Sequence, residues 1–229
     1  MTEKAGSDQV GTDDCRYQAP AFSYEAIYTH EEKRSRFICH LFPVKTDDEA
    51  MEKIGDIRNR YIDASHNCFA YILLNRGVTA VRFSDDGEPG GTAGQPILKS
   101  LELNGMAESL AIVTRYFGGI LLGAGGLSRA YSKAVSKGLE LASKAILIEC
   151  REVFVTVNYH EYGKLENYLK ENPVTVSKTE YTEHVKICLY ASTSMIPAVL
   201  QAIKDITRGT AKTSVGKTEI RKAVKGIIL

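Results

Sequence analysis

A glycine-rich stretch near the middle of the chain contains residue types that bind phosphate. It reads VTRYFGGILLGAGGLSRAY over residues 113–131, with five glycines ahead of an apolar pattern of helical spacing. A glycine loop that enters a helix leaves backbone N–H groups unpaired at the positive end of the helix dipole, where a phosphate binds well. The candidate anion ligands in this stretch are Arg115, Gly118, Gly119, Gly125, Gly126, Ser128 and Arg129.

The same glycines have a structural interpretation, because they permit a crossover from strand to helix where side chains would clash. The stretch is not a P-loop, since it lacks GKS or GKT, and GlyAlaGlyGlyLeuSer departs from GxGxxG at its last position. Arg115 has two interpretations as well: contact with an external anion, or an internal salt bridge with Asp85 or Asp86. The sequence leaves both questions open.

A second glycine loop, SDDGEPGGTAGQPIL at residues 84–98, is acidic. Asp85, Asp86 and Glu88 have the carboxylates with which a protein holds Mg²⁺ beside substrate phosphates. AspAspGly and GluProGly are also strong turn formers whose acids are often simply solvated. Thr92 and the helix expected after Gly94 offer a second helix start that could face an anion. We expect both loops to line one concave face.

His66 and Asn67, in DASHNCFAY, are further candidates because they precede an apolar strand pattern. A histidine beside an asparagine is suited to act as a base or hydrogen-bond donor, and equally to a structural role. The other histidines show no ligand spacing, so we expect no metal site, and no GxSxG motif suggests a hydrolase. No cofactor is expected, except Mg²⁺ if the protein is an enzyme.

Alternating and helical patterns predict the elements that position these residues. The first half has strands on either side of a charged turn, a helix opened by Thr46 and Glu49 in capping-box spacing, and a hairpin around residues 75–77. An apolar strand then leads into the glycine stretch and a long helix. The strands are expected at 22–28, 35–44, 67–74, 79–84 and 108–117, and the helices at 46–61, 97–103 and 127–144.

The second half has its own order of elements, strand-helix-strand-strand-helix-strand. This βαββαβ order is that of the ferredoxin-like fold. We therefore expect a flexible leader at residues 1–19, a first domain at 20–145 and a second domain at 146–229.

Four motifs together resemble a known family. SRFICHLFPV, DASHNCFAY, FSDDGEPGGTAGQPIL and VTRYFGGILLGAGGLSRAY closely resemble the IMPACT/YigZ family over residues 20–145, and RYFGG is similar to its signature. The resemblance implies an α+β fold class: an N-terminal α/β sandwich of the ribosomal-protein second-domain type, followed by a C-terminal ferredoxin-like βαββαβ domain. That second domain is similar to the one that bacterial members carry and to the last domain of elongation factor G.

The resemblance also suggests a role. Eukaryotic members are regarded as translational regulators that compete for an activator of the initiation-factor kinase, and bacterial members are suspected of binding nucleic acid or the translation machinery. Competition for the activator is not carried over to this chain, because we expect no extra N-terminal interaction domain and because a bacterial host would lack that kinase pathway.

Composition and charge fit a cytoplasmic protein. The 229 residues are 44% hydrophobic with a net charge of +1, and no stretch approaches the roughly 18 apolar residues of a membrane span. The five cysteines are widely spaced, which indicates reduced thiols. The basic final strand contributes candidate nucleic-acid contacts, although lysines also protect edge strands from aggregation. These candidates are Lys212, Lys217, Arg221, Lys222 and Lys225.

The residues and the resemblance together favour a non-enzymatic protein that binds RNA, the ribosome or translation factors. Two alternatives remain at this stage. One is an enzyme that uses the acidic and glycine-rich loops on a phosphorylated small molecule, and the other is a protein-interaction module. The sequence does not predict an oligomeric state.

Overall fold

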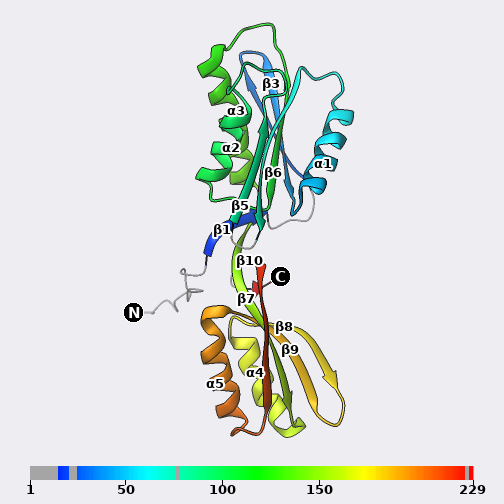
Figure 1. The fold of residues 1–229 in the computed structure, drawn as a ribbon, viewed down its shortest axis with the longest axis vertical. Helices are drawn as coiled ribbons and strands as arrows, with labels where there is room; N and C mark the ends of the chain where they lie inside the picture. The colour runs from blue at the N-terminus through cyan, green and yellow to red at the C-terminus, as the bar shows by residue number, and fades with distance from the viewer. Residues whose placement is uncertain (1–14, 21–24, 76–77, 225–226, 229) are drawn as a thin grey trace, which may run out of the picture. The chain divides into compact units, whose positions relative to one another are not determined.

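The computed structural model describes residues 15–20, 25–75, 78–224 and 227–228 of the chain. It divides into two compact units (Figure 1). The N-terminal unit is Tyr17–Ala145, and the C-terminal unit is Ile146–Leu229 with Met1–Arg16. Both mix helices with sheets, so the fold class is α+β.

The N-terminal unit is built on a five-stranded sheet in which all neighbouring strands are antiparallel. Its order is β2 (Ala26–Glu32), β3 (Ser35–Pro43), β6 (Ser109–Tyr116), β4 (His66–Asn75) and β5 (Val78–Ser84). The central strand β6 is buried from Ser109 to Arg115 because helices cover both faces of the sheet.

Helices cover both faces of this sheet (Figure 1). The first, α1 (Asp47–Arg60), starts where the capping motif predicts, with the Glu49 N–H donating to the Thr46 hydroxyl at 3.2 Å. Its apolar side packs on the sheet against large residues such as Tyr71 and Ile112. The expected helix at 46–61 is confirmed.

The other face carries α2 (Gly94–Leu103) and α3 (Gly123–Leu141), which contact each other and the sheet. The apolar pattern predicts a start for α3 at Leu127, but the helix begins four residues earlier, inside the glycine stretch. Gly138 packs α3 closely on β3, since a Cβ there would lie 3.3 Å from Cys39 Sγ. Gly123, Gly125 and Gly126 therefore lie in the first turn of a long helix, and Gly118 and Gly119 precede it.

The C-terminal unit has the predicted βαββαβ order. Its elements are β7 (Lys144–Val157), α4 (Tyr159–Glu171), β8 (Thr175–Tyr181), β9 (Val185–Ser192), α5 (Ile196–Ile206) and β10 (Lys212–Val224), and a short β11 (Ile227–Ile228) follows. The sheet order is β11-β10-β7-β9-β8. Both helices pack on one face, where Val153, Leu165 and Val199 share the core. This is the ferredoxin-like arrangement.

Two local expectations change against this structure. A leader that reaches residue 19 is too long, because β1 (Cys15–Pro20) pairs with β7, and Gln18 exchanges two backbone hydrogen bonds of 2.7 Å with Gly105 and Ala107. The strand β11 has no counterpart among the expected elements. Residues 1–14 and the turn residues 76–77 lie outside the described residues.

Two further expectations concern the reduced cysteines and membrane-spanning segments. Cys39, Cys68 and Cys150 are buried free thiols, and Cys188 is a partly exposed one. None of the helices that the structure describes has the length and apolarity needed to cross a membrane.

Candidate nucleic-acid interface

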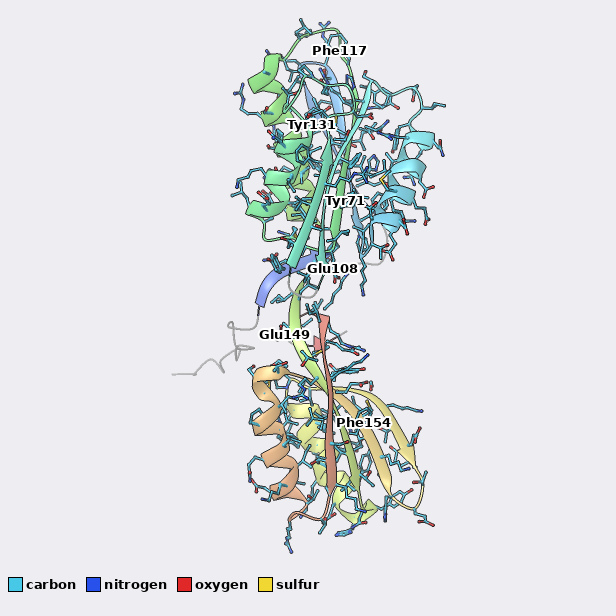
Figure 2. All side chains as sticks on the ribbon, in the orientation of Figure 1. Tyr71, Glu108, Phe117, Tyr131, Glu149 and Phe154 are labelled. Atoms are coloured by element: carbon cyan, nitrogen blue, oxygen red, sulfur yellow. The ribbon has the colours of Figure 1, made fainter. Side chains whose placement is uncertain are left out.

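A buried ion pair occupies the centre of the family motifs. Arg115 at the end of β6 donates to the Glu88 carboxylate at 2.6 Å, and the Tyr131 hydroxyl of α3 donates to the same oxygen at 2.8 Å (Figure 2 labels Tyr131). Arg115 is 5% exposed and Glu88 is 7% exposed. The structure therefore corrects the assignment of Arg115 as a ligand for an external anion. Its partner is Glu88, rather than Asp85 or Asp86.

Asp85 holds the acidic loop together. Its carboxylate accepts backbone N–H groups from Gly91, Ala93 and Gly94 at 2.8–3.0 Å. Burial raises the pKa of this carboxyl, but the three N–H donors outweigh burial and lower the pKa overall. Asp85 thus fixes the turn that starts α2.

Asp86 also binds inside the protein. It forms an ion pair with Arg58 of α1 and accepts the Asn67 N–H at 2.7 Å. Its φ of 47° lies in the left-handed region that suits the turn. All three acids thus have internal partners, and no cluster of His, Cys, Asp and Glu in the described part of the chain could hold a metal ion. The acidic loop therefore fits its turn-forming interpretation.

His66 and Asn67 are tied into the same framework. His66 Nδ1 lies 2.8 Å from the Asp86 carbonyl oxygen, which selects the tautomer with the proton on Nδ1. The Asn67 side-chain carbonyl accepts from the buried Thr114 hydroxyl at 2.7 Å. Both residues have the contacts of a structural role.

Two further anion candidates use their polar groups internally. The Thr92 side chain is buried and its hydroxyl donates to the Pro89 carbonyl at 2.7 Å. The Gly118 N–H donates to the Ser35 hydroxyl at 3.1 Å. Gly118 is bare because a Cβ there would lie 2.1 Å from the Arg34 carbonyl carbon. The structure removes Thr92 and Gly118 from the anion ligands.

The remaining glycines of the stretch differ in the backbone or packing constraint that favours glycine at each position. Gly119 and Gly123 have φ of 79° and 70°, which disfavours other residues. A Cβ on Gly126 would press on Leu122 at 3.0 Å. Gly125 has neither constraint, since its nearest neighbour would be Arg129 Nη1 at 3.5 Å, an ordinary contact. The fold does not require a glycine at 125.

The start of α3 is exposed and surrounded by positive charge. No side chain caps its first turn, no acid lies in that turn, and residues 123–125 are exposed. The side chains of Lys33, Arg129 and Lys133 line a hollow of about 270 Å³ beside it. We call these three side chains and residues 123–125 the α3 surface. N–H groups of a first helical turn have no acceptor within the helix, so they are available to an anion.

The three basic side chains form no ion pair or hydrogen bond with any of the described residues. Glu32 is the acid that shares this hollow, and its carboxylate lies 3.7 Å from His30 Nε2. Burial lowers the pKa of His30, and the charge of Lys133 lowers it further. Three basic side chains and one acid line this hollow, so the α3 surface has a local positive field.

A second, shallow hollow of about 660 Å³ adjoins the α3 surface, because Arg129 lines both. Its lining includes Ser128 and Arg129 of α3, Gly91 of the acidic loop and Gln95 in the first turn of α2. Residues from both glycine-rich regions therefore line one concave face.

The basic side chains of the final strand have different environments. Lys212 is exposed, Lys217 pairs with Glu219 at 3.4 Å, and Arg221 lies 3.6 Å above the Tyr190 ring. Lys222 has an interaction within the protein. Lys225 lies outside the described residues. These side chains do not form one basic row.

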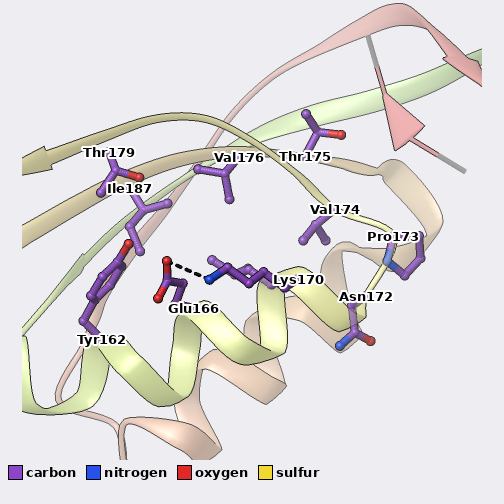
Figure 3. A pocket seen from close by; sticks show the side chains of 11 residues that line it. Tyr162, Glu166, Lys170, Asn172, Pro173, Val174, Thr175, Val176, Thr179 and Ile187 are labelled. Carbon is purple, nitrogen blue, oxygen red and sulfur yellow. Dashed lines mark ion pairs between the residues drawn. The ribbon is translucent and has the colours of Figure 1, made fainter.

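A further groove of about 440 Å³ lies between α4 and the edge strand β8 (Figure 3). Val174, Val176 and Ile187 give it an apolar lining, and an ion pair of 3.1 Å joins Glu166 to Lys170 along the helix. None of the sequence candidates lies in this groove.

Comparison with known proteins matches both units. The description "Impact N-terminal domain" matches residues 33–139, and "Domain of unknown function (DUF1949)" matches residues 155–210. The IMPACT family member YvyE of Bacillus subtilis is 39% identical over 196 residues, which are 85% of this chain and 90% of that protein. The chain belongs to the IMPACT family. The resemblance of the four motifs is thereby confirmed.

Other relatives show how far the similarity extends. The IMPACT family member YigZ of Escherichia coli is 32% identical, over 79% of this chain and 89% of YigZ. Protein IMPACT of Rattus norvegicus is 33% identical over 46% of this chain and 33% of its own length. A crystal structure of a hypothetical protein has a TM-score of 0.56 at 30% identity, covering 86% of this chain and 95% of that one.

Sequence reasoning did not name Lys33 or Lys133 as site residues. Lys133 carried a signal, because it lies four positions after Arg129 and therefore on the same side of α3. Lys33 carried none, because the turn between β2 and β3 meets α3 only in the folded unit.

Proposed function

We propose that this protein is a non-catalytic RNA-binding protein of the translation apparatus, and that the α3 surface contacts the RNA phosphates. The observation that carries the proposal is the coincidence of three unpaired basic side chains with an exposed, uncapped helix start. Backbone N–H groups and lysine or arginine side chains supply most protein contacts to nucleic-acid phosphates.

Two features favour RNA over a small phosphate compound. Arg129 lines both hollows, which suits an extended chain of phosphates. Phe117, Ile120 and Leu121 are exposed in the loop that leads to α3, and Figure 2 labels Phe117 there. Exposed aromatic and apolar side chains beside a basic groove are typical of surfaces that bind unpaired bases.

Gly125 supports the same proposal. A glycine near a helix start lowers helix stability, and here no packing or backbone constraint explains it. Absence of a side chain lets a phosphate approach the backbone closely. The enzyme alternative lacks a comparable observation, because Asp85, Asp86 and Glu88 direct their carboxylates to internal partners.

Charge reversal tests the proposal. Full-length protein is titrated with a labelled single-stranded RNA of about 16 nucleotides at several salt concentrations. We expect binding of the native chain to weaken with salt, and Arg129→Glu with Lys133→Glu to reduce the salt slope by about 0.7 for each phosphate that the variant no longer neutralises. Lys53→Glu on α1 is the matched control, because α1 covers the opposite face of the sheet.

Two results would contradict the proposal. Binding that does not change between low and high salt excludes phosphate contacts as its source. Equal affinity of the control and the double variant for RNA places the contact elsewhere. A partner recovered from cells that survives nuclease treatment would instead favour a protein-interaction module.

A further inference from the structure

The C-terminal sheet leaves one face uncovered by α4 and α5. On β7, Val153, Val155 and Val157 point into the core beneath the helices, so the alternating residues point to the other side. The register of the neighbouring strands places further residues on that side. We call this the open sheet face, and it consists of Glu152, Phe154, Thr156, Lys178, Glu180, Lys186, Cys188, Tyr190, Lys212 and Ser214.

Phe154 lies in the middle of the open sheet face and is 44% exposed (Figure 2). Its strand β7 lies between β10 and β9, and its direct cross-strand neighbours are the small residues Ser214 and Cys188. Gly216 also borders the ring, because a Cβ there would lie 3.5 Å from Phe154 Cε2. Small neighbours on these strands leave the aromatic ring accessible.

Tyr190 is another aromatic residue of the open sheet face, and both its ring and its hydroxyl have partners within the protein. It is 6% exposed, Arg221 lies 3.6 Å above its ring, and its hydroxyl donates to Glu152. Ala223 and Ile228 pack with it in a small apolar cluster. Tyr190 is therefore closed to a ligand, and Phe154 is the accessible ring among the described residues of this face.

Two lysines flank the ring. Lys186 of β9 and Lys212 of β10 both pair in register with Thr156, one on each side of β7 and two residues along it from Phe154. Both are exposed, and neither forms an ion pair with a described residue. Lys178 differs, because Glu180 neutralises it at 2.6 Å. Two exposed lysines therefore lie near the ring; Lys212 has no acid opposite it in the sheet, whereas Lys186 lies opposite Glu180 and its charge helps to lower the pKa of that carboxyl.

We propose that Phe154 is a stacking platform for an unpaired base of single-stranded RNA, and that Lys186 and Lys212 bind the flanking phosphates. This inference rests on the proposed function and names a second contact for it. Stacking on an aromatic ring accepts any base, and cationic side chains beside the ring match the phosphate charge. Sheets of the same βαββαβ order in RNA-recognition domains also present aromatic rings to two or three bases.

The test compares variants of the full-length protein for affinity to a single-stranded oligouridine and to an RNA duplex. We expect Phe154→Ala to weaken single-strand binding at least fivefold and duplex binding far less, since duplex bases are not free to stack. Phe154→Tyr should retain affinity because its ring remains. Tyr159→Ala is the matched control, an exposed aromatic at the start of α4.

Photo-crosslinking with 4-thiouridine RNA supplies an independent readout, and we expect adducts on the peptide that contains Phe154. Unchanged single-strand affinity of Phe154→Ala, with Arg129→Glu still weakening it, overturns this inference and leaves the proposed function intact. Absence of RNA binding by the native chain overturns both. A protein captured through Phe154 with no RNA present would also overturn it, since the occupant would then be a protein.

Discussion

At the residue scale, the buried trio of Arg115, Glu88 and Tyr131 explains the family motifs better than ligand binding does. The three residues come from the end of β6, the acidic loop and α3, and the ion pair is almost fully removed from water. A buried charge needs its partner, because the low dielectric interior does not solvate it. The trio therefore fixes the acidic loop against α3.

Removing one charge of this pair tests its role. Arg115→Met leaves the Glu88 carboxylate buried without a cation, and we expect the free energy of unfolding to fall by about 3–5 kcal/mol. The double variant with Glu88→Gln should be destabilised by less than the sum of the single variants, because no buried charge remains. Urea unfolding measures both. Arg36→Met is the control, since Arg36 is exposed over Tyr116. Additive effects of Arg115→Met and Glu88→Gln on the free energy of unfolding would contradict the pairing.

Asp85 predicts how stability depends on pH. The fold lowers its pKa, so its stabilising effect is present above the unfolded value of about 3.9 and disappears as pH falls through the folded value. Asp85→Asn should cost about 1–3 kcal/mol at pH 7, because fewer N–H groups keep an acceptor. The difference in the free energy of unfolding between the native protein and the Asp85→Asn variant should be smaller at pH 3 than at pH 7. Thermal unfolding at pH 3 and at pH 7 measures this difference. An equal difference at the two pH values would contradict the lowered pKa of Asp85.

At the element scale, α3 serves two purposes. Its buried side, which includes Leu127, Tyr131 and Leu139, holds the helix on the sheet. Its first turn is exposed, uncapped and rich in glycine, which is a poor start for a helix considered alone. Packing of the later turns stabilises the helix, so its start is free to keep residues that suit a ligand.

Replacing Gly125 separates the stability of α3 from its proposed role in binding RNA. Gly125→Ala should raise the free energy of unfolding by about 0.5 kcal/mol, since a Cβ fits and alanine favours a helix. The same change should weaken RNA binding by obstructing the bare first turn. Chemical unfolding and RNA titration measure the two effects.

Gly118→Ala is the contrasting variant. It should destabilise the fold by about 1–3 kcal/mol or more, because its Cβ would meet the Arg34 backbone. A stabilised Gly125→Ala variant with native RNA affinity would remove the ligand explanation for that glycine.

At the scale of the whole molecule, two units each have their own core and their own candidate contact. The core beneath α1 uses residues from 42 to 112, and the core beneath α4 and α5 uses residues from 153 to 203. The net charge of +1 provides no global attraction to a polyanion. The proposed binding of RNA therefore relies on local charge at the α3 surface and the open sheet face.

The sequence by itself determined the elements and their order. Capping at Thr46, alternation in the strands and the apolar pattern of α3 are local signals, so α1, the sheets and the βαββαβ unit could be predicted. The β1 strand could not, because its backbone partners, Gly105 and Ala107 among them, lie far along the chain.

Only the tertiary structure decided which polar residues meet. The sequence suggested Asp85 or Asp86 as an internal partner of Arg115, and the packing of the acidic loop on α3 selected Glu88 instead. Lys33 joined Arg129 because the β2–β3 turn reaches the start of α3. Phe154 became a candidate because β7 is central in its sheet and its neighbours are small. Side-chain pairing depends on distances between segments remote in sequence, and local patterns contain no information about those distances.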